Sequence, residues 1–308
     1  MAYEGIALII SIISATAFLG NTFVIYVLIR RRRTFLTKPY SIFILNLAIV
    51  DCLTAIFLVF SRFVYLPPMP VTSQVASELY CKIIWPPSMP FVLGFISVYT
   101  CLFLSFERWL AVVKPQVYRS LNCRHAILAV ILVWLWGAAL SGSTVSRVKF
   151  DAETKKCKWY RLPIGHAEMT WIDFTTQTLL PMSTMVALYS HMYYTLKKLP
   201  NHTCERESRL RRVTFVALAA CTALIAGWVP SRITFMMSKY DVISAHSPIT
   251  LTCATIAFLN SCVNPFLYGI YSSKFRQEYK MAFGRLACGS LPSRRRILVV
   301  ANATNEIS

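Results

Sequence analysis

The chain has 308 residues, of which 56% are hydrophobic and only 15% are charged, and its mean hydropathy is +0.53. Soluble domains usually contain about 25% charged residues, so this composition excludes an ordinary soluble domain. The net charge of +19 would suit nucleic-acid binding, but the basic residues gather in alternate connecting segments between apolar runs, which indicates membrane topology instead.

Seven nearly continuous apolar runs follow one another along the chain. Each is long enough to cross the hydrocarbon core of a bilayer, about 30 Å thick, as a helix. They cover about 6–29, 40–66, 85–113, 126–145, 171–196, 213–237 and 249–271. We therefore predict an all-α membrane protein, a bundle of seven transmembrane helices that forms one domain over 1–286.

A shorter amphipathic segment follows the seventh run. Residues 274–286 are predicted to lie as a helix along the inner membrane surface. Cys288, which comes directly after it, is a candidate site of lipidation, and 287–308 is a cytoplasmic tail.

Charge sets the orientation of the bundle. Basic connecting segments stay on the cytoplasmic side of membranes. Placing the amino terminus outside puts Arg30–Arg33, the arginines of 206–212 and the basic residues after Tyr271 inside. The sequence thus predicts an external amino terminus and an internal carboxyl terminus.

The ten cysteines sort by the same topology. Only Cys81 and Cys157 fall on the outer, oxidising face, so they are predicted to form a disulfide. Segments 146–150 and 157–161 alternate in polarity around 151–154, which predicts a β-hairpin in this outer connection. The bridge would hold the hairpin over the mouth of the bundle.

The stretch from Cys81 to Lys114 is predicted to be the spine of the bundle. Phe91 to Phe106 contains no charged residue, and Glu107 and Arg108 then arrive together at the depth of the inner interface. We expect one helix that is tied at its outer end and works at its inner end.

Polar residues inside the other runs point to internal sites. Asp51 lies near the middle of the second run, where an unpaired charge is expensive, so such residues usually serve a function. Asn260, Asn264 and Tyr268 recur every four residues and should line one inward face of the seventh helix. Trp134 in the fourth run is interpreted as a packing residue.

Prolines occur inside the fifth and sixth runs. Pro181 and Pro230 each free a carbonyl within a membrane helix, and such weak points are natural hinges.

Together these motifs resemble the rhodopsin-like (class A) G-protein-coupled receptors, and most of all the neuropeptide receptors. The resemblance covers about Gly20 to Cys288 and supplies one marker in each span except the fourth. The markers are Gly20-Asn21, Asn46-Leu-Ala with Asp51, Cys81, Glu107-Arg108-Trp109, Pro181, Trp228-Val-Pro230 and Asn264-Pro265-Phe-Leu-Tyr268.

The resemblance implies a coupling switch and a sodium pocket. In the switch, Glu107 holds Arg108 at rest, and Tyr189 and Tyr268 swing toward Arg108 on activation. The switch residues are Glu107, Arg108, Trp109, Tyr189, Asn264, Pro265 and Tyr268. The sodium pocket offers the oxygen ligands that a hard cation prefers. Its residues are Asp51, Ser97, Trp228, Asn260, Ser261 and Asn264.

The chain departs from the family pattern in two places. Two extra residues separate Cys81 from Arg108, and Trp85–Pro90 falls in that insertion, so the outer third helix should be distorted. The acid by which the sixth helix usually latches the arginine is absent, and Arg209, Arg211 and Arg212 crowd that region. A weak latch predicts measurable basal activity.

A ligand pocket is expected in the outer half of the bundle. Arg232 lies on the face of Trp228 and should point inward, where its partner is Asp173 or an anionic group of the ligand. The candidate pocket residues are Arg62, Asp173, Gln177, Trp228, Arg232 and Phe235.

The predicted function is that of a plasma-membrane receptor that binds an extracellular peptide-like ligand and activates a heterotrimeric G protein, with arrestin and the lipid bilayer as further partners and no nucleic acid. The alternatives are a receptor for a lipid or another small non-amine ligand, an orphan constitutively active receptor, and, ranked last, a seven-helix transporter. The seventh run contains no lysine for retinal, and Pro90 stands where amine receptors carry aspartate. No catalytic constellation is present in the sequence, so an enzyme is not expected.

Overall fold

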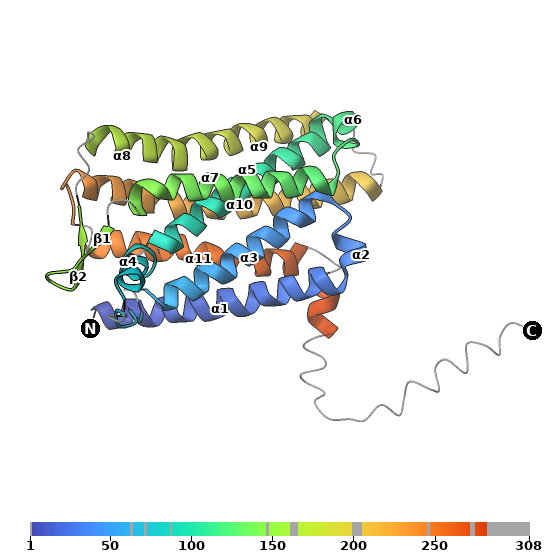
Figure 1. Cartoon of the computed structure of the whole chain (residues 1–308). Helices are drawn as coiled ribbons and strands as arrows, with labels where there is room; N and C mark the ends of the chain where they lie inside the picture. Colours follow the sequence, from blue (N-terminus) through green and yellow to red (C-terminus); the bar gives the residue numbers. More distant parts are fainter. Residues whose placement is uncertain are drawn as a thin grey trace, which may run out of the picture.

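Long helices lie side by side in one bundle in the computed structural model (Figure 1). The structure describes residues 2–61, 64–70, 73–86, 88–145, 148–160, 166–198, 205–244, 247–271 and 275–281. The long helices are α1 (Ala2–Arg30), α3 (Pro39–Val59), α5 (Ser88–Val113), α7 (Cys123–Val145), α10 (Glu205–Lys239) and α11 (Pro248–Tyr271). Short helices are α2 (Arg32–Phe35), α4 (Gln74–Ile83) and α6 (Pro115–Tyr118), and residues 275–281 are also helical.

Within the described ranges, six helices are long and apolar enough to cross a membrane, and they are the six long ones named above. The remaining expected span, 171–196, lies in a continuous helical stretch of three parts. These are α8 (His166–Phe174), the π-helical segment η1 (Thr175–Leu179) and α9 (Leu180–Lys198). The predicted bundle of seven spans with a short helix after it is confirmed.

Proline chemistry explains the π-helical segment. Pro181 has no N–H to donate to a carbonyl of the preceding turn. The Leu180 N–H donates to Thr175 O, five residues back, so the turn is widened there. The Thr176 carbonyl instead accepts a hydrogen bond from the Tyr99 hydroxyl of α5 at 2.5 Å. The wide turn therefore ties this span to α5.

The core is built around α5, which crosses the middle of the bundle (Figure 1). Leu104 of α5, Met185 of α9 and Leu224 of α10 belong to one buried cluster. Many large apolar side chains point outward instead, among them Leu19 and Leu135, which are 69% and 63% exposed. A surface of this kind suits hydrocarbon, and helices in lipid associate through such internal packing.

The predicted spine is wrong in one respect, because Cys81 and Arg108 lie on different helices. Cys81 belongs to α4, which ends at Ile83, and α5 begins at Ser88. Prolines disfavour a helical conformation in the residue before them, and Pro86 lies in the break. The expected distortion of the insertion is thus a complete interruption.

The second span is also shorter than expected. Helix α3 ends at Val59 rather than at 66, and residues 64–70 run without regular structure through Pro67, Pro68 and Pro70. Prolines cannot donate the hydrogen bonds that would continue the helix.

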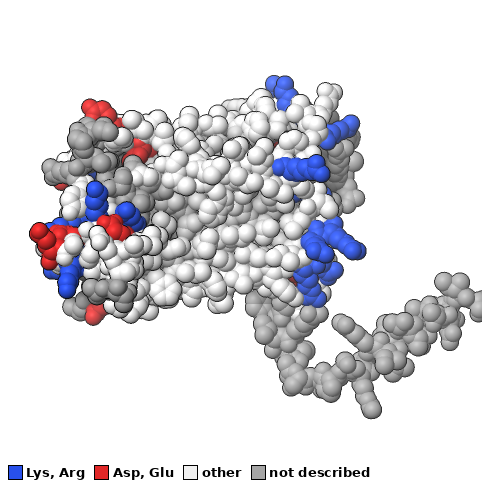
Figure 2. Space-filling view, viewed as in Figure 1, with Lys and Arg blue, Asp and Glu red and all other residues white. Residues whose placement is uncertain are grey.

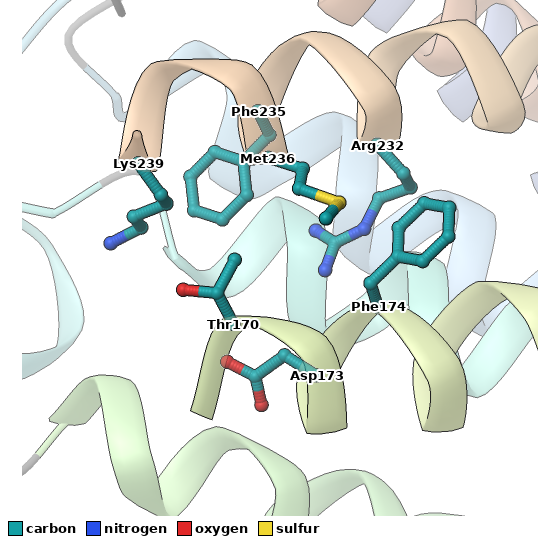
Figure 3. Close-up of a pocket in the computed structure, with 7 residues that line it drawn as sticks. All are labelled: Thr170, Asp173, Phe174, Arg232, Phe235, Met236 and Lys239. Atoms are coloured by element: carbon teal, nitrogen blue, oxygen red, sulfur yellow. The ribbon is translucent and has the colours of Figure 1, made fainter. Parts of the chain in front are cut away.

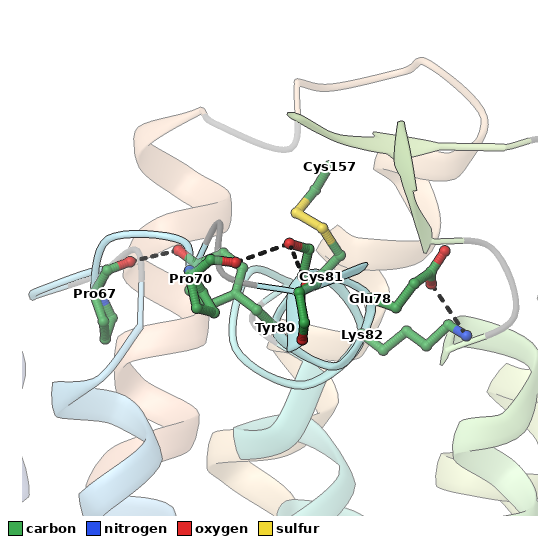
Figure 4. The surroundings of a disulfide bond; sticks show 9 residues. Pro67, Pro70, Glu78, Tyr80, Cys81, Lys82 and Cys157 are labelled. Carbon is green, nitrogen blue, oxygen red and sulfur yellow. Dashed lines mark hydrogen bonds and ion pairs between the residues drawn. A yellow bond between two sulfur atoms is a disulfide. The ribbon is translucent and has the colours of Figure 1, made fainter. Parts of the chain in front are cut away.

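The hairpin and the disulfide are confirmed. Strand β1 (Val148–Asp151) pairs antiparallel with β2 (Lys156–Trp159), and Phe150 lies opposite Cys157. Cys157 is bonded to Cys81 of α4 (Figure 4). The Tyr80 hydroxyl donates to the Pro67 carbonyl at 2.6 Å, so α4 is held to the segment after α3 as well.

An ion pair closes the hairpin turn. Lys158 lies against the Asp151 carboxylate and, as the largest cause, lowers the pKa of Asp151 to about 2. The same carboxylate accepts the Glu153 N–H at 3.1 Å. The turn therefore keeps its charged partner down to strongly acidic pH.

Charged side chains gather at the two ends of the bundle, with an uncharged belt between them (Figure 2). The end that carries α4, β1 and β2 is called the hairpin end here, and it has both acidic and basic residues. The opposite end, with α2, α6 and the last turn of α9, is called the basic end. Its described basic residues include Arg30, Arg31, Arg32, Arg33, Lys114, Arg119, Arg124, Lys197 and Lys198.

Candidate functional site

A buried ion pair lies near the basic end of α5. The Arg108 guanidinium donates to both carboxylate oxygens of Glu107 at 2.5 Å, and each side chain is only 4% exposed. A two-point contact between charged groups is among the stronger polar contacts in proteins. Arg108 also donates to the Tyr118 hydroxyl at 3.3 Å and lies 4.7 Å from the centre of the Tyr40 ring.

Tyr118 reaches this pair because the chain turns at Pro115, the first residue of α6. Burial, and next the Glu107 carboxylate, raise the pKa of Tyr118 to about 12. The phenol is therefore neutral at physiological pH and can accept from Arg108. Sequence reasoning missed Tyr40 and Tyr118, whose positions outside the apolar core of the spans gave no signal.

The two tyrosines expected to meet Arg108 contact other groups. The Tyr189 hydroxyl lies 3.2 Å from Ser105 Oγ and 3.5 Å from Cys221 Sγ. Tyr268 is buried and packs against the Phe275 ring, with 5.6 Å between the ring centres. In the described part of the chain, these two tyrosines therefore bond or pack against groups other than Arg108.

Trp109 of the same motif lies toward the outside of the bundle. Its indole Nε1 donates to His191 Nδ1 of α9 at 3.2 Å, and its ring stacks on the Phe106 ring. Trp109 thus holds α5 against α9 beside the ion pair. Pro265, another expected switch residue, is buried on α11.

Asp51, the centre of the expected cation pocket, is 1% exposed. Asn264 Nδ2 donates to Asp51 Oδ2 at 2.9 Å, and Asn260 and Ser261 are buried on the same helix. Ser97 Oγ is buried without a hydrogen-bond partner among the described residues. A buried carboxylate together with buried hydroxyl and amide oxygens supplies the oxygen ligands that a hard cation prefers.

A second polar contact near this pocket was not predicted. Trp134 Nε1 of α7 donates to Asn46 Oδ1 at 2.9 Å, and Asn46 Nδ2 donates to Thr100 at 2.8 Å. The interpretation of Trp134 as a packing residue was therefore incomplete. The sequence did contain a signal for this contact. The Asn46 amide lies in an apolar span, where it needs both a hydrogen-bond donor and an acceptor from the protein.

Trp228 lies at the centre of an aromatic group. Its ring centre is 6.2 Å from those of Phe91 and Phe95 and 6.5 Å from that of Phe258. The indole also occupies the space where a side chain at position 94 would stand, so Gly94 is required there. Through these contacts α10 meets both α5 and α11.

Arg232 points into the bundle from α10, one helical turn nearer the hairpin end. It is 6% exposed, it donates to Gln177 Oε1, and its guanidinium lies 4.7 Å from the Phe95 ring centre. Gln177 in turn donates to Asp173 at 3.4 Å. The inward orientation is as predicted, but Gln177 stands between the arginine and the expected acid.

A small pocket opens at this place toward the hairpin end (Figure 3). Arg232 Nε is buried there without a hydrogen-bond partner in the described part of the chain. The lining residues are Thr170, Asp173, Phe174, Arg232, Phe235, Met236 and Lys239. Of the other expected site residues, Arg62 and Cys288 lie outside the described residues. Of the expected surface helix 274–286, residues 274 and 282–286 also lie outside them.

Comparisons with known proteins all match this chain to receptors. A family model described as 7 transmembrane receptor (rhodopsin family) matches residues 20–268. Galanin receptor type 1 of Mus musculus is 26% identical over 302 residues, covering 92% of this chain and 83% of that receptor. The Homo sapiens protein of that name is 27% identical over 293 residues, with 89% and 80% covered. Neuropeptide FF receptor 2 of Rattus norvegicus is 26% identical over 307 residues, with 86% and 69% covered.

The packing of Trp228 on Gly94 leads to a stability prediction. A methyl group at position 94 would overlap the indole ring, so Gly94→Ala should force Trp228 or α10 to shift and should lower the free energy of unfolding by about 2 kcal/mol. Thermal unfolding of the purified protein measures this. Gly142→Ala on α7 is the matched control, because its new methyl group would contact nothing within 4 Å. Equal melting temperatures for the two variants would contradict the observed position of the indole.

Proposed function

The chain belongs to the rhodopsin family of seven-transmembrane receptors, and from this premise we propose that it binds an extracellular peptide and activates a heterotrimeric G protein. It is a multi-pass membrane receptor and not an enzyme. The observation that carries the proposal is the buried Glu107–Arg108 pair at one end of α5, whose other end contacts the pocket at Trp228 and Arg232.

We assign the hairpin end to the outside of the plasma membrane. Most of the described basic residues lie at the opposite end, and an excess of basic residues is typical of a cytoplasmic face. The Cys81–Cys157 disulfide lies at the hairpin end, and disulfides persist in the oxidising environment outside the cell. The amino terminus is then external.

A peptide ligand is supported by two observations. One of the relatives is named as a receptor for a neuropeptide. The hairpin, whose residues 152–156 are exposed, is fixed by the disulfide to α4 at the same end of the bundle as the pocket at Arg232. An extended chain bound there could place one side chain or terminus against Arg232.

The structure fits the resting state of such a receptor. Glu107, Tyr118 and Tyr40 engage Arg108, so the guanidinium must leave them before it can meet a G protein. A ligand can shift this equilibrium only through its higher affinity for the state in which Arg108 is free. Arrestin is proposed as a second partner of that state.

Signalling in cells tests the proposed function. A peptide library applied to cells that express the chain, with calcium and cyclic-nucleotide readouts, should give at least one response that is absent from untransfected cells. Arg108→Ala should abolish that response and leave binding of the same peptide largely intact, since the guanidinium is distant from the pocket. A response of full size in Arg108→Ala would rule out the assigned switch.

We further propose that Asp51, Ser97, Asn260, Ser261 and Asn264 hold a sodium ion beside Trp228. A bound ion would neutralise the Asp51 carboxylate. The chain's own part is to hold that carboxylate by the Asn264 amide in a dry interior.

Purified receptor in sodium chloride, compared with choline chloride, should melt about 3 °C higher, since an ion that binds only the folded state at tenfold its dissociation constant adds about 1.4 kcal/mol. Asp51→Ala should remove the difference, and sodium should also weaken binding of an activating peptide by linkage. A sodium effect of the same size in Asp51→Ala would refute the site.

Arg232 provides a test of the ligand pocket. Arg232→Glu should raise the concentration of an activating peptide needed for half-maximal response at least about tenfold, on the order of 1.4 kcal/mol, because the charge in the pocket is reversed. Lys82→Glu on α4 is the control, since it makes the same charge change at the hairpin end but outside both the hairpin strands and the pocket lining. If both variants respond like the wild type at equal surface expression, Arg232 does not contact the ligand.

A further inference from the structure

Three helices meet at a small polar group in the basic half of the bundle, called the Tyr189 cluster here. It consists of Tyr189 from α9, Ser105 from α5 and Cys221 from α10. Ser105 Oγ lies 3.4 Å from Cys221 Sγ and 3.2 Å from the Tyr189 hydroxyl, and that hydroxyl lies 3.5 Å from Cys221 Sγ. Each member therefore contacts the other two, and each comes from a different helix.

The surroundings of the cluster are apolar and dry. Ser105 is fully buried, Cys221 is 1% exposed and Tyr189 is 7% exposed. Leu104 and Met192 belong to the same buried core. Buried polar groups are nearly always paired, and an unpaired one is penalised by its lost hydration. The Ser105 hydroxyl also donates to the Cys101 carbonyl of its own helix at 2.6 Å, so separating α10 from α5 would leave mainly the Cys221 thiol without its partners. The cluster therefore resists that separation.

One member of the cluster, Tyr189, is also a residue of the coupling switch. The proposed function requires Tyr189 to move toward Arg108, whereas its hydroxyl is bonded here by Ser105 and Cys221. An open groove between α9 and α10, lined by Tyr189, Cys221 and Thr222 among others, lies on the outer side of the tyrosine. The hydroxyl is therefore held in the cluster by its polar contacts with Ser105 and Cys221.

We propose that Cys221 and Ser105 are positioning residues that hold Tyr189 and α10 in the resting arrangement, in place of the acid that the sixth helix lacks. This inference rests on the proposed function and names the regulation of the same switch. It replaces a charged latch at the surface by a neutral thiol–hydroxyl contact in the core. Such a contact is insensitive to salt, because no ion takes part in it.

A distance measurement without ligand or G protein tests the proposal. Spin-labelled unnatural amino acids at Val117 of α6 and Phe215 of α10, which are 51% and 53% exposed, report the separation of the two helices by pulsed electron resonance. Cys221→Ala should raise the population of a longer distance about fivefold, because loss of one net hydrogen bond, about 1 kcal/mol, changes an equilibrium by that factor. Cys221→Ser, which keeps a polar hydrogen-bonding atom, should resemble the wild type.

Two controls complete the test. Cys253→Ala removes a thiol from α11 outside the cluster and should leave the distances unchanged. If Cys221→Ala does not yield folded receptor, Ser105→Ala removes the contact from α5 and is measured in its place. Wild-type distances in the alanine variant, or equal shifts in Cys221→Ala and Cys221→Ser, would overturn the proposal. The distance measurement contains no G protein, so it decides the role of Cys221 by itself. If the chain activates no G protein in cells, the proposed function is refuted, but the distances still test the proposal for Cys221.

Discussion

Water is absent from the hydrocarbon core of a bilayer, so a polar side chain buried there is penalised unless another part of the protein bonds it. Much of the internal arrangement of this chain follows from that constraint. Asn46 is satisfied by α5 and α7, Asp51 by α11, and Tyr189 by α5 and α10. Because these contacts join different helices, the bonds that satisfy polar groups are also the bonds that set helix positions. A receptor of this kind changes state by exchanging one set of polar partners for another.

Helix α5 connects the two ends of this network. At the hairpin end its Phe91 and Phe95 rings contact Trp228 and Arg232 of α10, and at the basic end Glu107 holds Arg108. Between them, Tyr99 bonds the widened turn of η1 and Ser105 meets Tyr189. A shift of α10 at the pocket therefore acts on α5, the helix that also carries Glu107 and Arg108. Packed interfaces of this kind tend to have two discrete arrangements rather than a continuum.

Most of the fold could be predicted, because apolar length and the distribution of basic residues are properties of the linear sequence. The spans, the hairpin and the pairing of Cys81 with Cys157 needed no tertiary information. Partners that depend on three-dimensional packing could not be predicted. The widened turn after Thr175 aims Gln177 at Arg232, Trp134 bonds Asn46, and Tyr118 folds back on Arg108. The break between α4 and α5 was only half predicted, since prolines indicate a distortion but not its extent.

The proposed resting state depends on the bond from Glu107, which keeps Arg108 from engaging a G protein. The most direct measurement is nucleotide exchange by a panel of purified heterotrimers, one for each coupling class, with receptor in lipid nanodiscs and no ligand. Glu107→Gln keeps the shape of the side chain and removes the charge that holds the guanidinium. This variant should exceed wild-type exchange several-fold on at least one heterotrimer, and adding Arg108→Ala should return exchange to the receptor-free rate. Exchange by Glu107→Gln at or below the wild-type rate on every heterotrimer would contradict the proposed resting state.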